Sequence, residues 1–302
     1  MDENNVELLE NTEKQETNLP VPVENTEKPI EDKKPKKKGG RRKTDKPTEE
    51  VTDFEQLALL MNSTVEELKD EFFLFQIRKL MSKMAKTIVR FGVSDGNLAK
   101  IFQNAKTMGL DSVVVAPTYL SACEKQVDKI DGYKVGSILD FPFGESALKS
   151  KITGIADCRR WDVDEVTVMM PSAMLTKENK RFFKKQVFKL GKKYRGHVGI
   201  GLNATDLSEE KIERATKIVS ASKAEFITYV FVAATLEEVR AKIQFVKKFK
   251  SKKKVFVFAN VEHAEVVTEL FRLGVDKILT SYADDIAKDL FKKFKIKGAK
   301  LV

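Results

Sequence analysis

Short apolar runs alternate with longer amphipathic segments along most of the chain beyond residue 86. The apolar runs have strand length, and we expect eight strands at 87–91, 112–116, 134–139, 165–170, 198–202, 225–230, 255–259 and 277–281. Between them, apolar residues recur every three or four positions. This spacing predicts helices at 97–108, 147–160, 177–194, 208–221, 236–249, 264–273 and 284–294.

The alternation of strands and helices indicates the fold class. A strand–helix–strand repeat builds a parallel sheet, and eight such units are the number that closes a barrel. We therefore predict an α/β protein with a (β/α)8 TIM barrel, and an open doubly wound sheet is the alternative. No Gly-x-Gly-x-x-Gly turn follows the first strand, which argues against a dinucleotide-binding form of that alternative.

Two helix-start signals precede the barrel. Thr52 with Glu55 and Ser63 with Glu66 have the spacing of capping boxes, so we expect two helices within 52–86. The second, at about 64–86, carries an apolar stripe that we expect to pack on the barrel: Leu68, Phe72, Phe73, Phe75, Ile77, Leu80, Met81 and Met84.

Residues 1–51 have a different composition. They contain no aromatic residue and are rich in Glu, Lys, Asn, Thr and Pro, so they cannot bury enough apolar surface to offset the entropy of ordering. We expect a disordered charged tail at 1–51, N-terminal helices packing on the barrel at 52–86, and the barrel itself at 87–302.

The charge of the chain favours contact with polyanions. Of the net charge of +10, none comes from the first 50 residues, which hold 11 basic and 13 acidic residues, against 44 and 32 in the remainder. The two cysteines and two histidines have no metal-ligand or disulfide spacing, so we expect neither a metal nor another cofactor. No apolar run approaches the roughly 20 residues of a membrane span and no signal sequence opens the chain, so we expect a cytoplasmic protein.

Several stretches, in order, resemble deoxyribose-phosphate aldolase, a class I aldolase with a TIM-barrel fold. Asp111 to Tyr119 resembles the end of the first strand–helix–strand unit of that family, and Phe141-Pro142-Phe143-Gly144 resembles its Phe-Pro-Leu-Gly turn. Asp164 to Met169 resembles its Asp-Glu-Ile-Asp-Met-Val strand, and Ala224 to Thr228 the strand that bears the Schiff-base lysine. The match covers roughly residues 83–285.

The resemblance implies a retro-aldol cleavage of 2-deoxyribose 5-phosphate. That reaction needs a nucleophilic lysine, a second lysine that lowers the pKa of the first, and an aspartate that shuttles protons. The aspartate matches Thr167, the Schiff-base lysine matches Thr228 and the second lysine matches Phe256. None of these side chains can perform its counterpart's role, so we expect a divergent member that has lost the catalytic lysines.

The family's phosphate site is also altered. Its glycine pair matches Ala259-Asn260 and its strand-eight glycine matches Leu279, although such glycines let backbone N–H groups approach a phosphate. Thr280 and Ser281 remain as weak candidates for phosphate contacts.

Barrel enzymes carry their chemistry at the carboxyl ends of the strands. The polar residues expected there are Arg90, Asp140, Asn203, Asp206, Tyr229, Asn260, Glu262 and His263. Asp140, Glu262 and His263 are weak substitutes for a catalytic group, because an aspartate before a turn is more often a turn former and an acid opening a helix suits its dipole.

We therefore expect a binding or regulatory protein without Schiff-base aldolase activity. One alternative is an enzyme, of aldolase or altered chemistry, that acts on a phosphorylated sugar or carbonyl compound at the barrel mouth. Another is a basic protein that binds nucleic acid, ribonucleoprotein or an acidic partner through lysine-rich helices and through Lys33, Lys34, Lys36, Lys37, Lys38, Arg41, Arg42 and Lys43.

Overall fold

The computed structural model describes residues 53–61, 63–89, 92–127, 133–205, 207–249 and 252–293, all within one compact unit that spans Val51–Val302. The tail expected at 1–51, with its basic block, lies outside the described residues. No helix among the described residues is long and apolar enough to cross a membrane.

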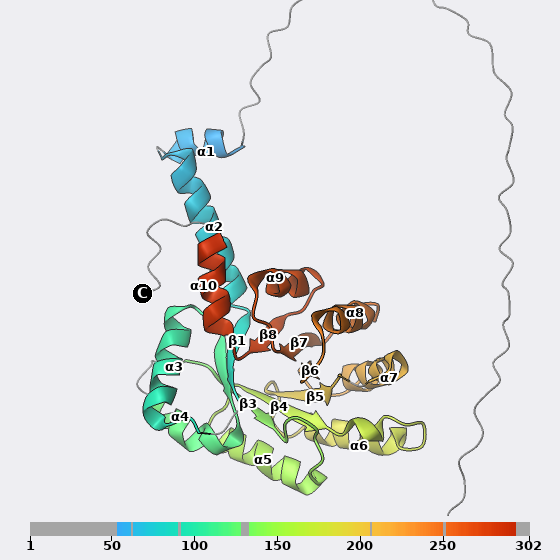
Figure 1. Ribbon diagram of the computed structural model, residues 1–302. Coiled ribbons are helices and arrows are strands. Elements are labelled where there is room, and N and C mark those ends of the chain that lie inside the picture. The colour runs from blue at the N-terminus through green and yellow to red at the C-terminus, as the bar shows by residue number, and fades with distance from the viewer. Residues whose placement is uncertain are drawn as a thin grey trace, which may run out of the picture. The chain divides into compact units, whose positions relative to one another are not determined.

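Eight parallel strands close into a barrel in sequence order, which confirms the predicted (β/α)8 fold (Figure 1). The strands are β1 (Met84–Ile88), β2 (Ser112–Val115), β3 (Val135–Leu139), β4 (Glu165–Met170), β5 (Val198–Asn203), β6 (Phe226–Phe231), β7 (Lys254–Ala259) and β8 (Lys277–Thr280).

Helices surround the barrel and two more precede it (Figure 1). They are α1 (Asp53–Met61), α2 (Val65–Met81), α3 (Asp95–Thr107), α4 (Leu120–Val127), α5 (Leu148–Arg160), α6 (Lys180–Leu190), α7 (Glu209–Ser220), α8 (Leu236–Lys247), α9 (Ala264–Arg272) and α10 (Ala283–Lys293). Short 3-10 turns η1 (Pro117–Tyr119) and η3 (Ser172–Met174) follow β2 and β4.

The first strand starts earlier than the sequence pattern indicated. The expected strand at 87–91 is found at Met84–Ile88, and the second N-terminal helix ends at Met81 rather than at residue 86. The N–H of Ser82 donates to Arg78 O and Leu80 O, which closes the helix. Pairing of Ala85 with Ser112 of β2 and Leu279 of β8 then fixes the strand register, and such long-range pairing outweighs local strand propensity.

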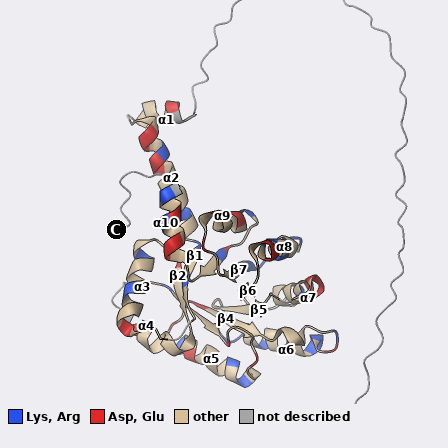
Figure 2. Ribbon diagram, viewed as in Figure 1, with Lys and Arg blue, Asp and Glu red and all other residues tan. Residues whose placement is uncertain are grey.

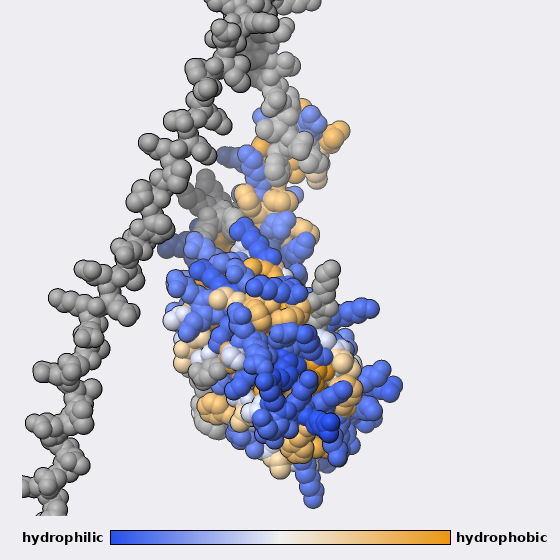
Figure 3. Space-filling model, turned by 90° about the vertical axis from the view of Figure 1, so that its right-hand side faces the viewer, coloured by the Kyte–Doolittle hydropathy of each residue, from blue (hydrophilic) through white to orange (hydrophobic). Residues whose placement is uncertain are grey.

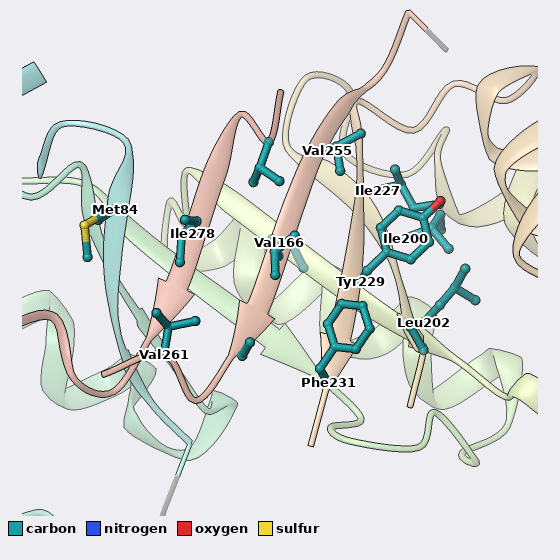
Figure 4. Packing of buried hydrophobic residues seen from close by; sticks show 14 of the residues in the cluster. Met84, Val166, Ile200, Leu202, Ile227, Tyr229, Phe231, Val255, Val261 and Ile278 are labelled. Atoms are coloured by element: carbon teal, nitrogen blue, oxygen red, sulfur yellow. The ribbon is translucent and has the colours of Figure 1, made fainter. Parts of the chain in front are cut away.

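An apolar layer lies between the strands and the helices. It is built from the outward side chains of the strands and the inner faces of the helices. Ile200 and Leu202 of β5 lie beside their pairing partners Ile227 and Tyr229 of β6 (Figure 4). These strands are buried on both faces, which is why they appear in the sequence as continuous apolar runs.

The interior of the barrel is also apolar and filled. β5 adds no side chain there at Gly199 and Gly201, where a Cβ would lie 2.0 Å from the ring of Phe226 and 2.4 Å from the sulfur of Met169, respectively. The large side chains of β4 and β6 therefore occupy the space that the glycines leave. The interior cluster consists of Ala85, Val114, Ile138, Met169, Phe226, Val230, Phe256, Phe258 and Leu279.

A buried cation lies at the amino-terminal end of the barrel. Lys277 opens β8, its side chain is 4% exposed, and its ammonium group donates to the carboxylates of Asp111 and Glu165 and, at 2.8 Å, to the hydroxyl of Ser112. Burial raises the pKa of Asp111, but attraction and hydrogen bonding from Lys277 outweigh this and hold the pKa below its usual value. Lys277 and its two carboxylate partners thus form an ion-pair network at this amino-terminal end, which we call the barrel floor.

We expect Lys277→Met to lower the free energy of unfolding by about 3 kcal/mol, because it removes the buried cation that the part-buried carboxylates of Asp111 and Glu165 share. Urea denaturation followed by circular dichroism measures this loss. Lys134→Met is a matched control, since Lys134 contacts the same Asp111 at 3.1 Å with a side chain that is 56% exposed, and should cost under about 1 kcal/mol. Equal losses in the two variants would contradict the floor as a stabilising network.

Candidate functional site

The three residues that match the family's catalytic positions come together inside the barrel. Thr167 of β4 and Thr228 of β6 are buried, and their hydroxyl oxygens lie 3.1 Å apart. Phe256 of β7 pairs with Thr228 in register, and its ring stacks on Phe226 with 4.3 Å between the ring centres. One of the two hydroxyls donates a hydrogen bond to the other, and the aromatic pair fills the neighbouring space.

Apolar side chains also meet at the carboxyl end of the barrel. Phe258, at the end of β7, lies against Phe141 from the β3–α5 turn, with 5.0 Å between ring centres. Met169 and Val230 are fully buried beneath them. A barrel enzyme binds its substrate at this end, and here aromatic and aliphatic side chains occupy it.

Asp140 forms the turn that carries Phe141. Its backbone has a positive φ of 62°, and its carboxylate accepts hydrogen bonds from the N–H and the hydroxyl of Ser146, both at 2.8 Å. The fully buried ammonium of Lys151 donates to the same carboxylate and, at 2.8 Å, to Gly144 O. Burial raises the pKa of Asp140, but the bonds from Lys151 and Ser146 outweigh it and keep the pKa below its usual value. This carboxylate stays ionised and is engaged in holding the turn.

Gly144 shows how closely this turn is packed. Its φ is 75°, and a Cβ there would lie 2.6 Å from the backbone of Met169 and Met170 on β4. Only glycine fits both the left-handed backbone and this approach. The hydrogen bonds of Lys151 therefore fix the turn, and the absence of a side chain at Gly144 lets the turn pack directly on the backbone of β4.

Glu262 and His263 lie on the surface at the start of α9. Both are exposed, and neither side chain forms a hydrogen bond or ion pair within the described part of the chain. No hydrogen bond or ion pair therefore links the side chains of these two weak candidates in the structure. Asn260 is exposed just before them, whereas Arg90 and Asp206 lie outside the described residues.

The candidate phosphate contacts face in different directions. Thr280 is fully buried, and its hydroxyl donates to Val261 O at 3.0 Å and accepts from the N–H of Tyr282 at 3.1 Å. Ser281 is exposed, and its hydroxyl lies 3.1 Å from that of Thr87. The hydroxyl of Thr280 is thus already hydrogen-bonded to the neighbouring backbone. Of the two residues, Ser281 alone is exposed to solvent.

Two further strand residues turn out to have local roles. Tyr229 points outward, where its hydroxyl lies 2.6 Å from that of Thr216 on α7. Asn203 is buried, and its side-chain oxygen accepts from the N–H of Thr205 at 3.1 Å. The sequence pattern placed both at strand ends but did not reveal on which side of the barrel each side chain lies.

The two fully enclosed lysines, Lys151 and Lys277, were not among the residues singled out from the sequence. Each belongs to a segment with many exposed charges, and its carboxylate partners are distant in sequence for Lys277 or lie in the preceding turn for Lys151. The position of Lys277 within the apolar strand 277–281 was the available signal, because a charge inside a barrel strand requires a partner.

Comparison with known proteins gives a consistent result. No model of a known protein family matches the chain. Deoxyribose-phosphate aldolase of Mycoplasmoides pirum is 23% identical over 212 residues, which cover 68% of this chain and 96% of that enzyme. The enzyme of Dictyoglomus turgidum is 23% identical over 219 residues, or 71% of this chain and 98% of that enzyme.

Solved structures agree with the sequence matches. QR15, described as an aldolase, superposes with a TM-score of 0.64 at 19% identity and covers 72% of this chain and 98% of its own. The deoxyribose-phosphate aldolase of Aeropyrum pernix superposes with a TM-score of 0.62 at 18% identity, over 73% of this chain and 94% of its own. The fold is thus a (β/α)8 barrel of the aldolase type. Among such barrels, the chain is a divergent relative of the deoxyribose-phosphate aldolases, as the sequence resemblance indicated.

We expect Asp140→Asn to lower the free energy of unfolding by about 3 kcal/mol, because the change leaves the ammonium of Lys151 buried without a carboxylate. Thermal and urea unfolding would measure the loss. Glu145→Gln removes an exposed carboxylate from the same turn and should be within about 0.5 kcal/mol of the unmodified chain. An Asp140→Asn variant of unchanged stability would contradict a structural role for this carboxylate.

Proposed function

We propose that this chain is a deoxyribose-phosphate aldolase-like barrel without Schiff-base aldolase activity that acts by binding. The observation that carries the proposal is the packed set Thr167, Thr228 and Phe256 at the matched catalytic positions. A threonine hydroxyl cannot form an imine with a carbonyl compound, and a phenyl ring neither carries charge nor transfers a proton.

The lysines on the described strands support the same proposal. β6 contains no lysine, Lys254 of β7 is exposed, and Lys86 of β1 pairs with Asp284. Lys277 lies inside, with its ammonium group 5.5 Å from the centre of the Phe256 ring, but it is paired with two carboxylates at the floor. An ammonium group held in this way has no lone pair with which to attack a carbonyl carbon.

The apolar mouth also favours binding over catalysis. A catalytic site requires convergent polar groups around the reacting atoms. Phe141, Met169, Val230 and Phe258 instead present carbon atoms at this end of the barrel. A ligand at the mouth would therefore be held by shape and apolar contact.

Borohydride reduction in the presence of 2-deoxyribose 5-phosphate tests the proposal. We expect no covalent adduct by intact mass and no release of glyceraldehyde 3-phosphate in a coupled assay, because no lysine occupies the matched catalytic positions and Lys277, inside the barrel, is paired with Asp111 and Glu165. The Mycoplasmoides pirum aldolase, treated in parallel, is the positive control. An adduct that maps to a lysine, together with turnover, would restore the aldolase assignment; loss of that adduct in Lys254→Met or Lys277→Met would identify the residue.

A cationic surface on α6 supports a second candidate function, the binding of a polyanion such as RNA. Between Lys180 and Arg195 the sequence has no acidic residue, and Figure 2 marks the basic residues of α6 in blue. The exposed cations of this surface are Lys180, Arg181, Lys184, Lys185, Lys189, Lys192, Lys193 and Arg195. Such a surface attracts phosphate backbones without reading their sequence.

We expect the full chain to bind a single-stranded RNA with an affinity that falls steeply with salt. Replacing Lys184, Lys185 and Lys192 by Gln should make the slope of log K against log salt less negative by about 2, since each phosphate contact to a single strand contributes roughly 0.7. Fluorescence anisotropy measures the slope. A control with the exposed Lys69, Lys100 and Lys149 replaced by Gln has the same net charge and should retain the slope. An equal change of slope in the two triple variants would contradict RNA binding at α6.

A further inference from the structure

The N-terminal helices expose much of the large apolar surface of the described chain. Eight large apolar side chains are exposed among the described residues, and five belong to α1 and α2. They are Leu59, Leu60, Met61, Phe72 and Phe75, with exposed fractions from 45% to 83%. Figure 3 shows hydrophobic side chains at the surface in this region. Apolar groups gathered in this way are typical of an interface.

Only half of the apolar stripe on α2 packs on the barrel. Ile77 and Met81 are each 1% exposed and belong to the core, whereas Phe72 and Phe75 are 45% and 60% exposed. Residues three apart lie on the same side of a helix, so Phe72 and Phe75 form one exposed seam. The expectation that the whole stripe covers the barrel is therefore wrong for Phe72 and Phe75.

The charges of α2 are arranged along its length. Glu66, Glu67 and Glu71 lie toward the start of the helix, and Arg78 and Lys79 lie in its last turn (Figure 2). Glu71 and Arg78 are both exposed and seven residues apart, which puts them on the same flank of the seam. Neither takes part in an ion pair with another residue of the described ranges.

This pattern is complementary to itself when two copies run antiparallel. A two-fold axis near Leu74 would place Phe72 of one copy against Phe75 of the partner subunit. The same operation would place Glu71 against the partner subunit's Arg78 and Arg78 against the partner subunit's Glu71. A parallel arrangement would instead turn this flank of each helix toward the opposite flank of the partner, so Glu71 would not meet the partner subunit's Arg78.

We propose that the chain forms a homodimer through antiparallel packing of α2, with Leu59, Leu60 and Met61 of α1 extending the apolar surface at both ends. A two-fold interface uses the same patch on both subunits and must be self-complementary, as this one is in both apolar and charged groups. The proposal concerns a surface on the N-terminal helices and does not depend on whether the barrel is catalytic.

Sedimentation of the full chain over a range of concentrations tests the dimer. The unmodified chain should sediment as a dimer, and Phe75→Asp should raise the dissociation constant at least about tenfold, as expected for an aromatic residue at the centre of an interface. Phe182→Asp on α6 is the matched control, because Phe182 is 52% exposed, and it should leave the dissociation constant unchanged. Both variants alter exposed positions, so their thermal unfolding should match that of the unmodified chain.

Charge reversal tests the antiparallel direction. Glu71→Arg alone and Arg78→Glu alone should each weaken the dimer, since each places like charges together, and the double variant should regain the original dissociation constant. A chain that is monomeric throughout would overturn the proposal, whether residues 1–52 or another protein occupies the surface. So would a dimer that neither single reversal weakens, or one that Phe182→Asp disrupts and Phe75→Asp does not.

Discussion

The need to fill the inside of a closed barrel is the constraint on which the rest of this structure depends. Eight strands enclose an apolar space in which water would lack hydrogen-bond partners. An unfilled gap there would lose van der Waals contacts for every atom that lines it. With Gly199 and Gly201 on β5, neighbouring strands must supply the volume, and Phe226 and Met169 do so. Phe226 in turn supports Phe256 by stacking. The residues at the matched catalytic positions are thus part of a continuous core, and their identity follows from packing.

The two ends of the barrel differ in polarity. At the floor, Lys277 is surrounded by two carboxylates and a hydroxyl, so its buried charge is balanced by opposite charges. At the mouth, Phe141 and Phe258 meet in an apolar contact. An aldolase needs the opposite distribution, with polar groups at the mouth, where substrate enters. The polarity along the barrel axis therefore supports the proposal that this chain lacks the aldolase chemistry of its relatives.

The sequence predicted the fold well, because eight apolar runs separated by amphipathic segments allow few arrangements. The family resemblance singled out Thr167 and Thr228, and the structure brings their two hydroxyls together inside the barrel. What the sequence could not predict were contacts between distant segments. β1 begins at Met84 because β2 and β8 select its register, and Tyr229 faces α7 and not the mouth. Likewise, the apolar stripe of α2 did not reveal that Phe72 and Phe75 remain exposed.

The way the turn between β3 and α5 is anchored affects how a ligand could enter the mouth of the barrel. Lys151 belongs to α5, yet its ammonium group holds both Asp140 and Gly144 O. The turn and the helix therefore move as one body, and Phe141 moves with them. Many barrel enzymes admit a substrate by opening a loop and enclose it by closing that loop. Here the corresponding segment is fastened to the scaffold, so a molecule at the mouth meets a wall of fixed shape. Selection at this entrance would be made by fit to a rigid surface before binding, without a closing motion afterwards.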